Sequence, residues 1–293
     1  MARILYSSYR FRIINYMTID EIIDKALAED IGDGDHTTLA TIPKDAQGMA
    51  KLLVKDNGIL CGVILAERIF HKVDPALQLY IYHFDGASIK KGDIVFEVRG
   101  RKASILKAER LVLNFMQRLS GIATATSVVV GKLRGLKTKI LDTRKTTPLL
   151  RSLEKYAVIT GGGENHRMGL FDMVMIKDNH VDFAGGIVKA IDAVHAYFVK
   201  TGIKLQIEIE VRNFDELQQV LDHGQVDRIM LDNFSVENMK KAVNLIAGRF
   251  ETEASGGITE ANVRTYAETG VNYISMGALT HQIKSLDMSL KAE

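Results

Sequence analysis

Short apolar runs and amphipathic stretches alternate along the second half of the chain. The apolar runs lie at 138–141, 173–176, 205–211, 228–231, 250–254 and 272–276. The stretches between them, such as FDELQQVLDH and SVENMKKAVNLIA, repeat apolar residues at the spacing of a helix with one buried face. A strand followed by a helix, repeated this often, predicts parallel strands joined by right-handed crossovers. An open doubly wound sheet and a closed barrel both fit the pattern.

The first third of the chain has a different pattern. Thr18 and Glu21 are spaced as a capping box, which predicts a helix that continues to about Glu29. The sequence DIGDGDHTT then predicts a turn-rich loop. Strand-like runs follow at 50–55, 77–84 and 93–100. These runs and the turn residues between them predict an antiparallel sheet.

One apolar-patterned segment joins the two parts. The sequence ILKAERLVLNFMQ predicts a helix, and Gly121 is expected to end it before a second helix. We divide the chain into a first domain, 1–118, and a second domain, 119–293. Residues 1–16 are expected to be an extension ahead of the first domain, and the tail 281–293 could pack back on that domain.

Polar residues follow the predicted parallel strands at their C-terminal ends. In chain order they are Arg144 and Lys145, Lys177, Glu208 and Glu210, Asp232, Ser255-Gly256-Gly257, and Gly277. In an α/β barrel the active site lies at the C-terminal ends of the strands. The polar positions therefore favour the barrel over the open sheet.

The segment after the first predicted strand indicates an anionic ligand. Arg144 and Lys145 lie just before a helix that is expected to begin at Pro148, and free N–H groups at a helix start bind anions. Three glycines at 161–163 follow that helix. A solvated turn and a helix stop are the simpler interpretations of either feature alone. Together they predict bare backbone and cations close to an anion.

Three further basic residues belong to the same prediction. His166 and Arg167 come soon after the glycines, and Lys177 ends an apolar run. Lys177 is either an anion contact or a lysine that forms a Schiff base. The density of cations around it favours the anion contact.

Acidic residues on the predicted strands need partners, because an unpaired carboxylate inside a barrel is costly. Glu210 and Asp232 are the clearest cases, and strand alternation places Glu208 on the same face as Glu210. Their candidate roles are magnesium binding, hydrogen bonds to sugar hydroxyls, and stabilisation of positive charge in a transition state.

The last two predicted strands end in glycine. Ser255-Gly256-Gly257 precedes a helix that is expected to start at Thr259, and Gly277 follows the sixth apolar run. This pattern is typical of the phosphate cradle formed by the late strands of many barrels.

Composition narrows the class of protein. Hydrophobic residues make up 46% and charged residues 25% of the 293, as in an ordinary globular enzyme. The 38 Lys and Arg nearly balance the 36 Asp and Glu, which argues against nucleic acid as the main partner. No apolar run is long enough to span a bilayer. The single cysteine, Cys61, excludes an intrachain disulfide, and we expect a protein of the reducing cytoplasm.

Several segments resemble one known enzyme family. They are DTRKTTP at 142–148, GGGENHR at 161–167, MIKDNH at 175–180, EIEV at 208–211, MLDNFS at 230–235, EASGGI at 253–258 and SMGALTH at 275–281. In the first domain the matching segments are ERLVLNFMQRLSGIAT at 109–124 and ALAEDIGDGDHTT at 26–38. The chain from about Met17 to its end thus resembles the quinolinate phosphoribosyltransferases, the decarboxylating enzymes of pyridine-nucleotide synthesis. One departure is Leu149, which stands where many relatives have glycine.

The resemblance implies an α/β fold, with an N-terminal α/β sandwich domain followed by an incomplete α/β barrel of seven strands. It also implies a homodimer in which Arg110 reaches the substrate of the partner subunit. The carboxylates of quinolinate and the phosphates of phosphoribosyl pyrophosphate would be bound by Thr143, Arg144, Lys145, His166, Arg167 and Lys177. The 5′-phosphate would be bound by Ser255, Gly256, Gly257 and Gly277.

On the same resemblance, Glu210 and Asp232 would attend the ribose and Mg²⁺, and both would be catalytic together with Lys145. The alkylated pyridine ring can itself accept the electrons that decarboxylation releases, so no organic cofactor is expected. Three alternatives remain open at this point. They are a related molybdenum-associated phosphoribosyltransferase-like protein with another acceptor, a class I aldolase that uses Lys145 or Lys177, and a non-catalytic phosphate sensor.

Overall fold

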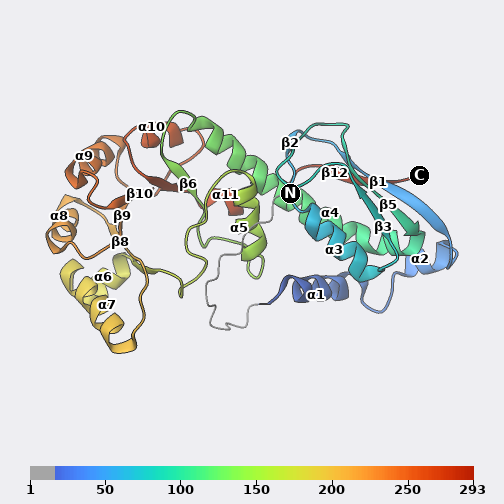
Figure 1. Ribbon diagram of the computed structural model, residues 1–293, viewed down its shortest axis with the longest axis horizontal. Coiled ribbons are helices and arrows are strands. Elements are labelled where there is room, and N and C mark those ends of the chain that lie inside the picture. The colour runs from blue at the N-terminus through green and yellow to red at the C-terminus, as the bar shows by residue number, and fades with distance from the viewer. Residues whose placement is uncertain (1–16) are drawn as a thin grey trace.

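The computed structural model describes residues 17–293, so the expected extension at 1–16 lies outside the described residues. Two sheets lie towards opposite ends of the molecule, and the long helix α4 (Lys102–Lys132) runs from one towards the other (Figure 1). One sheet has four antiparallel strands and the other has six parallel strands. The α/β class expected from the sequence is confirmed.

The first helix begins as predicted. α1 (Ile19–Ile31) has the capping box, in which the Thr18 hydroxyl accepts the N–H of Glu21 and the Glu21 carboxylate accepts the N–H of Thr18. The loop after it is shorter than predicted, because α2 (His36–Thr41) occupies its second half. The Asp35 carboxylate accepts the N–H of Thr38 at 3.0 Å and caps this short helix.

The antiparallel sheet has the strand order β12-β1-β5-β3. Its strands are β1 (Gln47–Val54), β3 (Gln78–Ile81), β5 (Ile94–Arg101) and β12 (Met288–Ala292). A short ladder of β2 (Gly58–Ile59) and β4 (Ser88–Ile89) and the helix α3 (Val63–Val73) complete this part. The last strand, β12, pairs with β1, so the end of the chain returns to the first sheet.

α4 is one continuous helix, and the predicted break at Gly121 is wrong. A Cβ at this position would overlap the carbonyl oxygen of Lys284. Gly121 therefore lets the C-terminal segment pack directly on the helix, although glycine costs about 1 kcal/mol of helix propensity relative to alanine. Sequence alone could not distinguish close packing from a helix end at this glycine.

The parallel sheet has the order β6-β11-β10-β9-β8-β7. All six predicted runs form its strands, which are β6 (Lys139–Leu141), β7 (Val174–Ile176), β8 (Ile207–Val211), β9 (Arg228–Asp232), β10 (Glu251–Ser255) and β11 (Tyr273–Ser275). The crossover helices are α5 (Arg151–Thr160), α6 (Asp178–Ala184), α7 (Ile187–Thr201), α8 (Phe214–His223), α9 (Val236–Ile246) and α10 (Val263–Ala267). The short helix α11 (Ala278–His281) follows β11 and leads to β12.

The expected seventh strand is reduced to a single bridge. Glu164 pairs in parallel with Leu141 of β6, donating its N–H to Ile140 O and accepting the N–H of Asp142. This bridge continues the sheet beyond β6, and within residues 17–293 no strand pairing joins it to β7. The resemblance implied an incomplete barrel of seven strands; the sheet has six strands and this bridge, and we keep the name barrel for this domain.

Two helices begin later than predicted. α5 begins at Arg151 instead of Pro148, because Leu149 adopts a left-handed φ of 68° that no helix residue has. α10 begins at Val263 instead of Thr259, because the Asn262 side chain accepts the N–H of Thr259 and forms a turn first.

Candidate active site

The basic loop after β6 lies against the end of β11. Arg144 and Lys145 are exposed, and the N–H of Lys145 donates to the Thr143 hydroxyl at 3.0 Å. The Thr280 hydroxyl donates to the carbonyl oxygen of Lys145 at 2.8 Å. A Cβ at Gly277 would lie 2.9 Å from Cδ of Lys145, so the lysine stem passes directly over this glycine. The predicted cation and the predicted phosphate-binding glycine are therefore neighbours.

A buried ion pair that sequence reasoning missed fixes the GENHR segment to the end of β6. The Lys155 ammonium donates to the Asp142 carboxylate and to His166 O, the latter at 2.9 Å. Asp142 also accepts the N–H of His166 at 2.8 Å and, at 2.6 Å, the Asn165 amide in the orientation that satisfies both ends of that amide. Burial raises the pKa of Asp142 and lowers the pKa of Lys155. The only feature of the sequence that could have indicated this pair is the charge of Lys155 on the apolar face of a predicted helix.

The three glycines have a different role from the predicted approach to a ligand. A Cβ at Gly161 would overlap the carbonyl of Ala123 on α4, and a Cβ at Gly163 would lie 3.0 Å from the Thr126 side chain. Gly161 also follows the last residue of α5. Helix packing and a helix end therefore explain at least two of the three glycines, and the prediction of a ligand cradle is corrected for those two.

His166 turns into the interior of the barrel. Its Nε2 lies 2.9 Å from a Glu208 oxygen and 3.2 Å from a Glu253 oxygen, and all three side chains are buried. Because Glu208 is on β8 and Glu253 is on β10, the segment from Glu164 onwards crosses the interior between strands that are not neighbours. The other ring nitrogen, Nδ1, accepts the N–H of Arg167 at 2.6 Å.

This buried group shares protons. Burial alone lowers the pKa of His166, but the two carboxylates outweigh burial and raise it to about 9. Burial and the nearby Glu253 carboxylate raise the pKa of Glu208 to about 7. Because Nδ1 accepts a hydrogen bond, the ring proton in this geometry is on Nε2. Nε2 lies between the two carboxylates without a hydrogen bond of good geometry, and direct binding of a substrate carboxylate by His166 stays a prediction.

Within residues 17–293, His166, Glu208 and Glu253 are also the set of side chains close enough to bind one metal ion, with their ligand atoms within 4.8 Å of one another. Arg228 Nη1 lies 3.3 Å from Glu253. This guanidinium balances one of the two buried carboxylates. His166 Nε2, both Glu208 oxygens and Glu253 Oε1 are buried without a hydrogen-bond partner among the described residues.

Arg167 and Arg144 interact electrostatically. Arg167 is largely buried, and its Nη1 donates to Met173 O at 3.2 Å. Burial, followed by the positive charge of Arg144, lowers the pKa of Arg167. An anion that binds near both guanidinium groups would offset this repulsion. That these two residues form an anion site stays a prediction.

The predicted acidic residues occupy two different environments. Glu210 is almost fully buried, and its Oε2 accepts the Lys177 ammonium at 2.9 Å. Asp232 ends β9, is half-buried and accepts the Asn233 amide at 2.6 Å. Asn233 has a left-handed φ of 55°. Lys177 and Glu210 thus form a pair, while Asp232 keeps a carboxylate oxygen for another ligand.

The predicted phosphate cradle is a loop of positive-φ glycines. Gly256 and Gly257 have φ values of 91° and 63°, which favour glycine. A Cβ at Gly256 would overlap the Asn233 side chain, so this glycine also permits the contact between the β9 and β10 loops. Ser255, at the end of β10, is half-buried. The loop brings Ser255 and the glycines to the same edge as Asp232.

Arg110 is the predicted site residue that lies apart. It is exposed on α4, and within the described part of the chain no ion pair joins it to the other predicted site residues. Its predicted role belongs to a second copy of the chain.

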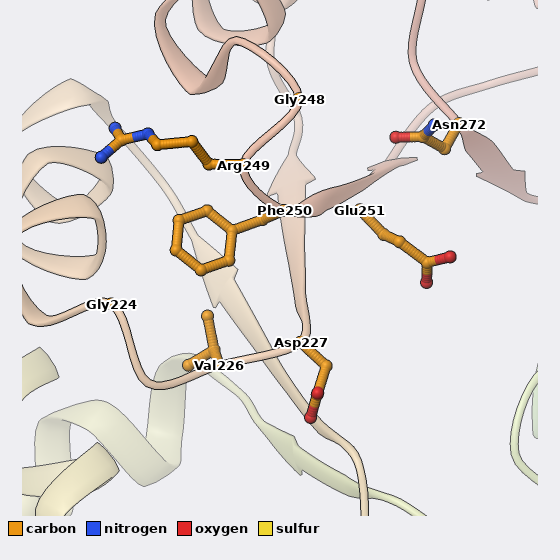
Figure 2. A pocket seen from close by; sticks show the side chains of 8 residues that line it. All are labelled: Gly224, Val226, Asp227, Gly248, Arg249, Phe250, Glu251 and Asn272. Carbon is orange, nitrogen blue, oxygen red and sulfur yellow. The ribbon is translucent and has the colours of Figure 1, made fainter.

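The opposite end of the parallel sheet has a hollow of different composition. Figure 2 shows the Phe250 ring facing Val226, with Asp227 and Glu251 at the edge. The Asp227 carboxylate accepts a backbone N–H at 2.6 Å, and Glu251 pairs with Arg228. These carboxylates already have partners, and the predicted site residues follow the other ends of the strands.

Comparisons with known proteins match both domains of the chain to one enzyme family. The N-terminal domain model of quinolinate phosphoribosyl transferase matches residues 35–120, and the C-terminal domain model matches residues 122–291. The chloroplastic nicotinate-nucleotide pyrophosphorylase (carboxylating) of Arabidopsis thaliana is 48% identical over 287 residues, which cover 93% of this chain and 82% of that protein. The probable enzyme of the same name from Bacillus subtilis is 40% identical over 94% of both chains.

Solved structures are equally similar. The crystal structure of NadC from Streptococcus pyogenes has a TM-score of 0.89 and 40% identity, and the match covers 93% of this chain and 95% of that chain. The nicotinate-nucleotide pyrophosphorylase of Francisella tularensis has a TM-score of 0.88 at 40% identity, covering 94% and 96%. The fold, the order of the site segments and these similarities together place the chain in the quinolinate phosphoribosyltransferase family.

Proposed function

We propose that the chain transfers the phosphoribosyl group of phosphoribosyl pyrophosphate to quinolinate with decarboxylation, in the biosynthesis of NAD. The observation that carries this proposal is the surplus of cations at the barrel mouth. Arg144, Lys145 and Arg167 gather there without a carboxylate partner of their own among the described ion pairs. Quinolinate has two carboxylates and the donor has several more negative charges, so the two substrates supply the missing anions.

In the proposed reaction the pyridine nitrogen of quinolinate bonds to C1 of the ribose, and the bond from C1 to the pyrophosphate oxygen breaks. Positive charge develops on the ribose, and Glu210 and Asp232 would stabilise it. The alkylated nitrogen is cationic. When the 2-carboxylate leaves as CO2, its bonding electrons stay on C2 beside this nitrogen, and C2 then takes a proton to give nicotinate mononucleotide.

The protein's own contribution is positioning and charge. Lys145 and the Ser255–Gly257 loop approach the barrel mouth from different strands, which suits a donor with phosphates at both ends of the ribose. Lys177, held by Glu210, is suited to an anion contact and argues against a Schiff-base role. These two features favour transfer over the aldolase alternative.

Mg²⁺ is part of the proposal. Asp232 retains a free carboxylate oxygen of the hard type that Mg²⁺ prefers, whereas Glu210 is already paired, so the donor phosphates would supply most of the remaining ligands. Bound there, the ion would neutralise charge on the leaving pyrophosphate. No organic cofactor is required by the electron balance above.

We further propose a homodimer in which Arg110 completes the partner subunit's site. Arg110→Ala and Lys145→Ala would each be inactive alone, whereas a mixture that exchanges subunits would regain part of the wild-type rate. Mass spectrometry of the mixed dimers confirms exchange. No regained activity in exchanged dimers would contradict the shared site.

The compartment stays a prediction. Among residues 17–293 no helix combines the length and the apolar character that crossing a membrane requires. The proposed cytoplasmic location rests on the composition of the chain, and the Arabidopsis relative is a chloroplastic protein by name.

The direct test of the reaction is a mass-spectrometric assay with phosphoribosyl pyrophosphate, Mg²⁺ and either quinolinate or nicotinate. Formation of nicotinate mononucleotide and CO2 from quinolinate alone is the expected result. Product from nicotinate alone, or no product from folded protein, would contradict the proposal. The same assay without Mg²⁺ and with EDTA tests the metal requirement.

A further inference from the structure

Arg118 joins three segments that border the proposed donor site. It lies on α4, and its Nη2 donates to Glu154 Oε1 at 2.6 Å, to the Thr147 hydroxyl at 2.7 Å and to Thr280 O at 3.1 Å. Its Nε donates to the same Glu154 oxygen at 2.8 Å. One guanidinium group thus connects the loop after β6, the helix α5 and the helix α11.

The partners of Arg118 continue to the candidate phosphate ligands. The Thr280 hydroxyl donates to Lys145 O at 2.8 Å and lies 3.2 Å from Gly277 O. The second oxygen of Glu154 accepts the N–H of Thr147 at 3.0 Å. The loop that carries Lys145 is therefore held at two points that both lead back to Arg118.

Neutralising the buried carboxylate of Glu154 accounts for only part of this arrangement. The Glu154 side chain is fully buried and needs one cation beside it. A lysine would meet that need as a point charge, whereas the planar fork of arginine also reaches the hydroxyl of Thr147 and the carbonyl of Thr280. These two additional bonds go to the segments that carry Lys145 and Gly277.

We propose that Arg118 is a positioning residue that sets Lys145 over Gly277 and so shapes a phosphate-binding subsite for the donor. This inference rests on the proposed function for the identity of the donor. It concerns how the loop is held, and Arg118 itself need not touch the substrate.

The test compares Arg118→Lys with a matched control, Arg101→Lys. Arg101 also pairs with a buried carboxylate, Asp74, at 2.8 Å, but it lies at the end of β5 in the antiparallel sheet. Both variants should lower the melting temperature to a similar extent. Only Arg118→Lys should raise the KM for phosphoribosyl pyrophosphate, by about tenfold or more because the loop is misplaced, with the KM for quinolinate nearly unchanged.

A second pair of variants leaves Glu154 and Arg118 intact. Thr280→Val removes the hydroxyl that donates to Lys145 O and should raise the same KM, whereas Thr280→Ser keeps the hydroxyl and should behave like the wild type. If Arg118→Lys does not fold, the KM for phosphoribosyl pyrophosphate of these two Thr280 variants tests the proposal. A KM for the donor that is unchanged in both Arg118→Lys and Thr280→Val would overturn the proposal and leave Arg118 as a structural partner of Glu154.

Binding of inorganic pyrophosphate, measured by calorimetry, separates this inference from the proposed function. If the wild type has no turnover but binds pyrophosphate, weaker binding by Arg118→Lys still supports the positioning role. Equal binding by wild type and Arg118→Lys contradicts it. A wild type that neither turns over nor binds pyrophosphate would overturn both proposals.

Discussion

The charged residues at the barrel mouth form two groups, an inner layer of buried, paired charges and an outer layer of exposed cations. In the inner layer, Asp142 faces Lys155 and His166 faces two glutamates, all of them buried and paired within the chain. In the outer layer, Arg144 and Lys145 are exposed. A buried charge without a partner is costly, so removal of one partner of an inner pair should destabilise the fold. The outer cations cost little in the free protein, and their partners can be the substrates.

The basic residues that lie close together in the sequence are of two kinds: some pair with buried carboxylates inside the fold, and others can meet a ligand. His166 and Arg167 are adjacent in the chain, yet His166 turns inward to Glu208 and Glu253 while Arg167 lies near Arg144. Residues that hold a loop in place and residues that meet a ligand can therefore alternate along one segment.

The largest expected effect breaks the inner layer. Asp142→Asn removes the charge opposite the fully buried Lys155 and should lower the free energy of unfolding by about 3–5 kcal/mol. Lys139→Gln, on the strand that precedes Asp142, breaks an exposed pair with Glu164 and should cost less than about 1 kcal/mol. Urea unfolding of both variants measures the difference. Equal losses would contradict the division into layers.

The outer layer should respond in activity instead of stability. Lys145→Ala should lower kcat/KM by about a hundredfold or more, because a cation at the proposed leaving group is lost. Its melting temperature should stay close to that of the wild type. Lys241→Ala, which breaks an exposed pair on α9, is the control and should leave both quantities unchanged. A wild-type rate in Lys145→Ala would remove this residue from the site.

The inner layer should also make stability depend on pH. The pKa of His166 is raised to about 9 from 6.5, so its stabilising contribution is complete below pH 6.5 and is lost as the pH rises through 9. The pKa of Glu208 is raised to about 7 from 4.5, so its contribution is lost between those values. The melting temperature should therefore fall as the pH rises from about 4.5 to about 9.

Glu208→Gln is the companion variant for this experiment. It removes one of the two carboxylates that raise the pKa of His166, so its melting temperature should fall less steeply over the same range. Parallel profiles for wild type and Glu208→Gln would show that this cluster does not control the pH dependence.

The smallest expected effect concerns Leu149, which lies just after the outer cations. Its φ of 68° is unfavourable for leucine, and its side chain is 69% exposed. Leu149→Gly should raise the free energy of unfolding by up to about 1 kcal/mol, whereas Leu149→Ala keeps the strained backbone and should not. Thermal unfolding distinguishes the two. A lower free energy of unfolding for Leu149→Gly would contradict the interpretation that the backbone at Leu149 is strained.

Much of the fold could be predicted from local pattern. The six parallel strands and the capping box at Thr18 follow from residues close together in sequence. The errors came from contacts across the fold. Gly121 was predicted to end a helix and Gly161 to approach a ligand, and only the contacts with Lys284 and Ala123 show why glycine is needed at each position.

The sequence was enough to predict where the site lies, but it could not predict which of the site residues contact one another. Strand ends placed Glu210, Asp232 and Lys177 at one edge, and the structure adds that Lys177 and Glu210 are paired. Arg118 and Glu154 could not be found, because each lies on a helix where an isolated charge resembles a solvated one. Their partnership depends on how α4 crosses α5.

The most direct test of the outer layer is the relative affinity of the free protein for quinolinate and nicotinate, measured by calorimetry in wild type and in Arg144→Ala. We predict that the wild type binds quinolinate at least about tenfold more tightly, since the second carboxylate meets an otherwise unpaired guanidinium, and that Arg144→Ala loses most of this preference. Equal affinities in the wild type, or a preference that survives in Arg144→Ala, would contradict the account.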